Sequence, residues 1–193
     1  MKNSQSGQTL IELAIAMSVI ALIATVTSNV LDSARRGVSL VAATSELRSI
    51  FHEVRMIAIA RNCNVGVKFN AHEKDWTWTV YADGDGDGIR NDDIQRGRDR
   101  QIQRAKRFEH RPAVIGVPPG DVPDPLAPGK KLRDRLPVRF GTSTICSFSR
   151  DGEATNGSIV ITDAKHAVIV QISGGAGRVG VLRWNGKRWT SGV

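Results

Sequence analysis

The feature of the sequence that most constrains its fold is an apolar run near the N-terminus. Between Leu10 and Val30 the only charged residue is Glu12. An α-helix rises about 1.5 Å per residue, so a helix over this run is about 32 Å long, and the hydrocarbon core of a bilayer is about 30 Å thick. The run therefore predicts a helix that crosses a membrane.

Two residues distinguish this run from a secretory signal peptide. A signal peptide has its small-residue cleavage site after the apolar stretch. Here Gly7 precedes the stretch, so cleavage after Gly7 leaves the helix on the mature chain. Glu12 places a carboxylate in the third position of the run, and a carboxylate at the bilayer centre costs about 2.5 to 3.5 kcal/mol. We therefore expect Glu12 to pair with a cation on another molecule, the alternative being an ordinary single-span anchor with a stray glutamate.

The segment Gly7–Leu13, with the sequence GQTLIEL, resembles the class III signal of type IV pilins and type II secretion pseudopilins. The resemblance implies that prepilin peptidase removes residues 1–7 by cutting after Gly7, and that it methylates the new N-terminal residue, Gln8. The family most often has phenylalanine at this position. The resemblance also implies that Glu12 pairs with the N-terminal amine of a neighbouring subunit during assembly.

Beyond Asp32 the pattern predicts that the helix continues and becomes amphipathic. One helix over about residues 9–60 is the simplest interpretation, and Gly37 loosens it, since glycine inside a helix costs about 1 kcal/mol relative to alanine. The apolar positions recur with the spacing of a helix that lies on a core. They are Leu47, Ile50, Phe51, Val54 and Ala58.

From Asn64 onward the apolar residues alternate with a period of two, which predicts strands. Residues 65–69 and 76–81 are expected to form a hairpin, and the Pro-rich stretch 116–137 is expected to be a surface loop. Further strands are predicted at 138–140, 144–148, 158–162, 166–172 and 179–184.

The order of a helix followed by strands predicts an α+β fold. We expect a long N-terminal helix, transmembrane in its first half and amphipathic in its second half, packed on a mainly antiparallel β-sheet. The expected organisation is a leader over 1–7, a transmembrane and assembly helix over 8–31, and a periplasmic globular domain over 32–193.

The segments 83–99, 148–152 and 177–178 resemble the GspH/FimT-type subgroup of minor pseudopilins and pilins. This resemblance implies a pilin-like structural subunit of a type II secretion pseudopilus or a type IV pilus, and not an enzyme. It implies a single-pass inner-membrane protein with a periplasmic C-terminal domain, which later joins a filament. The implied partners are other pilins or pseudopilins, prepilin peptidase and the inner-membrane assembly machinery.

Asp83, Asp85 and Asp87 alternate with glycines, as at the start of a calcium-binding EF-hand loop. With Asn91 and Asp93 they are candidate ligands of Ca²⁺. The alternative is a Gly-rich turn in which aspartate favours the turn conformation. No other cofactor is expected, since the histidines form no metal-ligand pattern and no phosphate-binding Gly-rich motif occurs.

The chain has a formal charge of +8 and a pI near 10.1, which favours anionic partners. Near the C-terminus, basic residues are interleaved with Trp184 and Trp189, a combination that suits DNA binding. FimT-like minor pilins implicated in DNA uptake have a C-terminal Gly-Arg-x-Arg element, of which this chain retains Gly177-Arg178 without the second arginine. The alternative is a solvated face with the indoles packed on the sheet. The candidate DNA-binding residues are Arg178, Arg183, Lys187 and Arg188.

Cys63 and Cys146 are the only cysteines. A periplasmic location permits a disulfide between them, and closing so long a loop stabilises a fold by several kcal/mol in the chain-entropy treatment. Two buried free thiols are the alternative.

Overall fold

The computed structural model describes residues 10–73 and 75–192, apart from the side chains at positions 24, 26, 28 and 29. Its first element is the helix α1 (Leu10–Arg61), in agreement with the helix predicted over about 9–60. The chain divides between Val38 and Ser39 into two compact units, and α1 contributes to both.

In the first unit, the described apolar side chains of α1 are exposed. Polar side chains in the same stretch bond back to the helix: the Ser18 hydroxyl donates to the Ala14 carbonyl at 2.7 Å, and the Thr27 hydroxyl donates to the Ile23 carbonyl at 2.8 Å. A hydroxyl bonded in this way does not need water as a partner. The exposed large apolar residues are Leu10, Ile11, Leu13, Ile15, Met17, Val19, Ile20, Leu22, Ile23, Val30, Leu31 and Val38.

Across the residues that the structure describes, no helix is long and apolar enough to cross a membrane. The membrane span expected over 8–31 is therefore not found among them. Part of that segment, residues 8 and 9 and the side chains at 24, 26, 28 and 29, lies outside the described residues.

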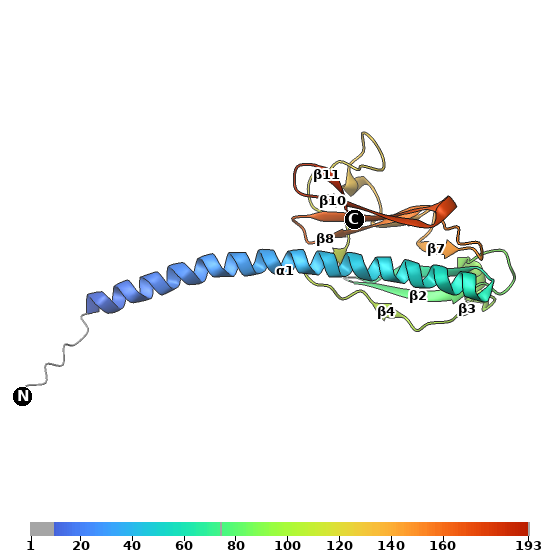
Figure 1. The fold of residues 1–193 in the computed structure, drawn as a ribbon, viewed down its shortest axis with the longest axis horizontal. Helices are drawn as coiled ribbons and strands as arrows, with labels where there is room; N and C mark the ends of the chain where they lie inside the picture. The colour runs from blue at the N-terminus through green and yellow to red at the C-terminus, as the bar shows by residue number, and fades with distance from the viewer. Residues whose placement is uncertain (1–9, 74, 193) are drawn as a thin grey trace, which may run out of the picture. The chain divides into compact units, whose positions relative to one another are not determined.

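The second unit begins at Ser39 and contains the remainder of α1 and, within its described residues, two antiparallel sheets (Figure 1). The first sheet has the order β3-β2-β1-β7, with β4 also paired to β2. Its strands are β1 (Val65–Ala71), β2 (Trp76–Ala82), β3 (Arg100–Gln101), β4 (Lys106–Arg107) and β7 (Ile145–Phe148). The single sheet expected from the sequence is thus corrected to two.

The second sheet has the order β11-β10-β9-β8-β5, with β6 also paired to β8. Short helices complete the unit: α2 (Asn91–Arg96), η1 (Leu132–Asp134) and η2 (Gly174–Ala176). The strands of this sheet are β5 (Val114–Ile115), β6 (Val138–Phe140), β8 (Gly157–Thr162), β9 (Ala167–Ser173), β10 (Arg178–Trp184) and β11 (Trp189–Gly192).

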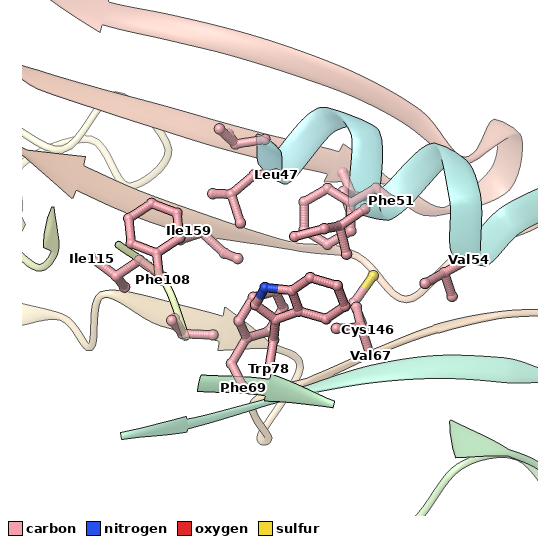
Figure 2. Packing of buried hydrophobic residues seen from close by; sticks show 14 of the residues in the cluster. Leu47, Phe51, Val54, Val67, Phe69, Trp78, Phe108, Ile115, Cys146 and Ile159 are labelled. Atoms are coloured by element: carbon pink, nitrogen blue, oxygen red, sulfur yellow. The ribbon is translucent and has the colours of Figure 1, made fainter. Parts of the chain in front are cut away.

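The main core lies where the second part of α1 packs against both sheets. Figure 2 shows Leu47, Phe51 and Val54 directed from α1 into this core. The Phe51 ring lies 6.2 Å from the Phe69 ring of the first sheet and 6.0 Å from the Phe140 ring of the second. Burial of such a side chain contributes about 1.5 to 3 kcal/mol, and each edge-to-face aromatic pair adds about 0.5 to 1.5 kcal/mol. The amphipathic half of the helix therefore joins the two sheets.

The Pro-rich stretch 116–137 is more than the surface loop that was expected. Val122 and Leu132 are buried in a second, smaller core with Val160, Ala167 and Ile169. The Leu132 N–H donates to the Val122 carbonyl at 2.8 Å, which holds the stretch together at this point. Prolines prevent long strands, but two isolated apolar residues are enough to fix the stretch on the face of the second sheet that is turned away from α1.

Candidate functional site

The predicted processing residues, Gly7 and Gln8, lie outside the described residues. Glu12 lies in the first turn of α1 and is exposed. The first turn is the positive end of the helix dipole, so a carboxylate there is favourable in itself. Within the described part of the chain, no side chain pairs with Glu12, and its carboxylate is available to a partner.

A groove in the second unit brings together arginines from two distant parts of the chain. The groove lies between the second part of α1 and β10 and has a volume of about 740 Å³. We call it the basic groove. Two of the candidate DNA-binding residues, Arg178 and Arg183, line it together with Arg48 and Arg55 of α1. Its other lining residues are Val41, Thr44, Ser45, Ser49, Phe51, His52, Gly177 and Val179.

The other two candidate DNA-binding residues do not line the groove. Lys187 and Arg188 are exposed in the turn between β10 and β11. The neighbouring indoles are partly buried and face each other, with ring centroids 5.5 Å apart for Trp184 and Trp189. The Trp189 ring N–H donates to the Pro123 carbonyl at 2.8 Å. The indoles therefore pack on the second core and are only partly exposed.

Two glycines set the position of Arg55. Gly152 and Gly177 adopt positive φ angles of 82° and 55°, which favour glycine. A Cβ at Gly152 would lie 3.0 Å from the Arg55 Nε, and a Cβ at Gly177 would lie 3.3 Å from it. These glycines allow the half-buried guanidinium of Arg55 to lie against the backbone of the turns at 152 and 177.

The residues 83–99 form the acidic loop, in which Asp83 organises the backbone. Its carboxylate accepts hydrogen bonds from the N–H groups of Asp85, Gly86 and Gly88 and from the Asn64 side chain, at 2.7 to 3.1 Å. Burial alone would raise the pKa of Asp83, but these hydrogen bonds to the charged form outweigh it, and the pKa lies below its ordinary value. Asp83 is therefore a charged structural centre of the loop.

The carboxylates of the acidic loop lie close together, as the calcium prediction requires. One oxygen from each of Asp83, Asp85 and Asp87 lies within 4.8 Å of the others. Partial desolvation and the neighbouring Asp85 raise the pKa of Asp87. Asn91 and Asp93, the other predicted ligands, lie on α2, and Asp93 is not part of this close group of carboxylates.

Arginines already oppose some of this negative charge. Arg98 lies 3.6 Å from the Asp85 carboxylate and 3.3 Å from that of Asp93, and Arg90 pairs with Asp87. Asp99, the last residue of the acidic loop, is buried and accepts a hydrogen bond from the Arg90 N–H at 2.9 Å. Burial raises the pKa of Asp99, and the charges of Asp83 and Asp93 raise it further.

The two cysteines are free thiols in the structure, so the predicted disulfide is not found. The sheet register explains this, because Cys146 of β7 is opposite Val67 of β1, four residues beyond Cys63. Cys63 itself precedes β1 and lies in the turn that follows α1, outside the paired strands. Burial raises the pKa of the Cys146 thiol well above its ordinary value.

A long N-terminal helix whose second part packs on antiparallel strands defines the class of pilin-like α+β proteins. The comparisons with known proteins identify the family. The prokaryotic N-terminal methylation motif matches residues 2–28, and the family model of the type II transport protein GspH matches residues 43–177, well over half of the chain. The chain belongs to the GspH family, whose members are structural subunits. No curated protein and no solved structure matches it.

Proposed function

We propose that this chain is a minor subunit of a type II secretion pseudopilus or a type IV pilus, made as a precursor and cut after Gly7. The observation that carries the proposal is the exposed apolar surface of α1 from Leu10 to Val38, most of which lies within the matched methylation motif over residues 2–28. Exposed apolar surface of this extent needs a lipid or protein environment. The inner membrane supplies it before assembly, and neighbouring helices supply it in the filament.

In this proposal, Glu12 directs assembly. A charge near the end of an apolar helix stays at the membrane interface until a packed neighbour offers an amine in a medium of low dielectric constant. The pairing then favours transfer of the helix from the bilayer to the filament. The second unit would lie in the periplasm and present its two sheets and loops to the other subunits.

The first test is mass spectrometry of the mature chain isolated from native cells. The proposal expects an N-terminus at Gln8 that bears a methyl group. A chain that still begins at Met1 would contradict the processing step. A chain that begins at Gln8 without a methyl group would support the cleavage step and contradict the methylation step.

Uptake of DNA is the alternative function, and Arg178 and Arg183 in the basic groove favour it. The packing of Trp184 and Trp189 weighs against it, because sequence-independent binding of single strands uses exposed aromatic rings. Binding of the full-length chain to DNA at two salt concentrations tests this role. If Arg178→Ala combined with Arg183→Ala leaves the affinity unchanged, the C-terminal site is excluded.

Calcium binding by the acidic loop is a separate prediction, favoured by the approach of Asp83, Asp85 and Asp87. Titration of the full-length chain with Ca²⁺ tests it directly. We expect heat of binding at millimolar calcium that Asp85→Asn abolishes. The absence of any heat would leave the loop as a turn that Asp83 and the two arginines stabilise without metal.

A further inference from the structure

The basic groove concentrates positive charge with no negative charge to balance it. In the described part of the chain, Arg48, Arg55, Arg178 and Arg183 all line the groove, and none of them forms an ion pair. Elsewhere in the described chain some arginines pair, as Arg111 does with Asp75 at 2.8 Å, and others, such as Arg104, do not. What distinguishes the groove is that four arginines without an ion pair line one space.

The charges of α1 are segregated around the helix, which explains why the groove lacks an acid. Glu46 bonds to His110 and to the Trp78 ring N–H, and Glu53 accepts a hydrogen bond from the Gln103 side chain at 2.6 Å. Both glutamates thus engage residues on the side of the first sheet. The basic residues of the same helix, spaced by three and four positions, face β10 of the second sheet. They are Arg48, His52 and Arg55.

Arg55 adds a partly buried cation to the wall of the groove. Its Nε atom is buried, and among the described residues it has no hydrogen-bond acceptor. An unsatisfied buried donor destabilises a fold, and more so when it carries charge. The Nε atom lies against Gly152 and Gly177, while the side chain as a whole is only half buried and lines the groove, so its other N–H groups are the ones that a bound carboxylate would meet. Arginine is well suited to this, because its guanidinium binds a carboxylate through two parallel hydrogen bonds.

We propose that the basic groove is the docking site for an acidic segment of another polypeptide, whose carboxylates pair with Arg48, Arg55, Arg178 and Arg183. The rest of the lining fits a polypeptide. Val41, 51% exposed, offers apolar contact, and the hydroxyls of Ser45 and Ser49 offer further hydrogen bonds.

The groove favours a polypeptide over a nucleic acid for two reasons. The lining contains no tryptophan or tyrosine and Phe51 is 1% exposed, so the small imidazole of His52 is the one ring of the lining that a base can reach. In addition, β11 pairs only with residues 181–184 of β10, so within the described chain Arg178–Gly180 have a strand neighbour on the β9 side alone. An open strand edge can accept the backbone of an extended peptide.

The proposal rests on the proposed function in one respect, the origin of the partner. In a filament, the acidic segment belongs to a neighbouring subunit that does not share the basic character of this chain. The groove then determines which subunit lies next to this one, because it binds an acidic segment and repels a basic one. Removal of its arginines would weaken one contact, whereas loss of Glu12 would prevent entry into the filament altogether.

The experiment measures binding to the full-length chain in a non-ionic detergent at about 0.15 M salt, where long-range attraction is largely screened. The probe is a fluorescein-labelled decapeptide of alternating glutamate and alanine, followed by fluorescence anisotropy. A single-stranded oligonucleotide of similar net charge is measured in parallel. The variants are Arg48→Gln, Arg178→Gln and Arg55→Gln, and the matched control is Arg104→Gln, an exposed arginine outside the groove.

We expect each groove variant to raise the Kd for the acidic peptide about tenfold, which corresponds to about 1.4 kcal/mol, with Arg104→Gln within about twofold of the unmodified chain. Arg48 and Arg178 are exposed, so their variants keep the fold even if Arg55→Gln lowers the thermal midpoint. The proposal is overturned if the peptide does not bind, if Arg104→Gln weakens binding as much as the groove variants do, or if the oligonucleotide binds more tightly than the peptide. The N-terminus of the native chain and the Glu12 variant test the proposed function independently of these results.

Discussion

The two parts of α1 contain similar apolar residues but differ in what covers them. Up to Val38 the described leucines, isoleucines and valines are exposed, whereas Leu47, Phe51 and Val54 in the second part are buried between two sheets. The second part is therefore stabilised within the chain. The first part offers the same kind of surface without an intramolecular partner, so its stabilisation has to come from outside.

The sharpest test of this difference is the same substitution made in each part of the helix. Leu47 is fully buried and Leu22 is 68% exposed. We expect Leu47→Ala to lower the free energy of unfolding of the second unit by about 2 to 5 kcal/mol, because it leaves a cavity. Leu22→Ala should change it by less than about 0.5 kcal/mol. Tryptophan fluorescence during urea unfolding in detergent measures both, and equal losses would contradict the comparison.

The same comparison between the two parts of α1 can be made with a charged residue, Glu12 in the first part and Glu46 in the second. Glu46 bonds to Trp78 and His110, so Glu46→Gln should cost the second unit about 1 to 2 kcal/mol. Glu12→Gln should leave the unfolding transition unchanged and should remove the chain from filaments isolated from cells. Immunoblots of sheared filaments and thermal denaturation measure the two effects. Incorporation of the Glu12 variant at the normal level would refute the role of this carboxylate.

Acid should act on the second unit through Asp163, whose side chain is fully buried. Burial tends to raise the pKa of Asp163, but hydrogen bonds from the backbone and ring of His166 and from the Lys165 N–H lower it overall. A carboxyl whose pKa is lower in the folded state stabilises the fold above its unfolded pKa, and this contribution is lost as the pH falls through the folded value. Unfolding measured between pH 6 and pH 3 should therefore show less pH dependence in Asp163→Asn than in the unmodified chain. An unchanged profile would exclude Asp163 as a contributor.

The smallest expected effect is at Gly37, next to the boundary between the two units. A Cβ there would meet no atom within 4 Å. Gly37→Ala should stabilise the helix by about 0.5 to 1 kcal/mol through its higher helix propensity. Far-ultraviolet circular dichroism during heating should show later loss of helix. A lower helix content would indicate that this glycine has a role in bending.

Local patterns predicted most elements of the fold, because they depend on residues that are close in sequence. The apolar spacing around Leu47 and Phe51 predicted the helix, and the alternation around Val67 and Trp78 predicted the first hairpin. The short strands β3, β4, β5 and β11 were missed, since none of them has alternating apolar residues, and so were the short helices α2, η1 and η2. Two sheets were not distinguished from one, because strand partners are set by contacts between distant segments.

The basic groove was also only partly predicted, because its residues come from segments that are distant in sequence. Arg178 and Arg183 were identified by their density near the C-terminus, but Arg48 and Arg55 were missed. Their helical spacing of seven was visible in the sequence, yet only the fold places them opposite β10. The disulfide prediction was wrong for a similar reason. A periplasmic compartment permits a disulfide, but the positions of Cys63 before β1 and of Cys146 opposite Val67 depend on the fold.

The second core has a consequence for the order in which the second unit opens. Alternate residues of β8 and β9 contribute to the main core on one face and to the second core on the other, so most residues of these two strands are buried. Both strands also have hydrogen-bonded neighbours on each side. Their amide protons should be the slowest in the chain to exchange with deuterium, because exchange there requires opening of the whole unit. A protease that cuts near Leu132 would remove one of these covers, and so would speed up exchange across the most protected strands without touching the helix.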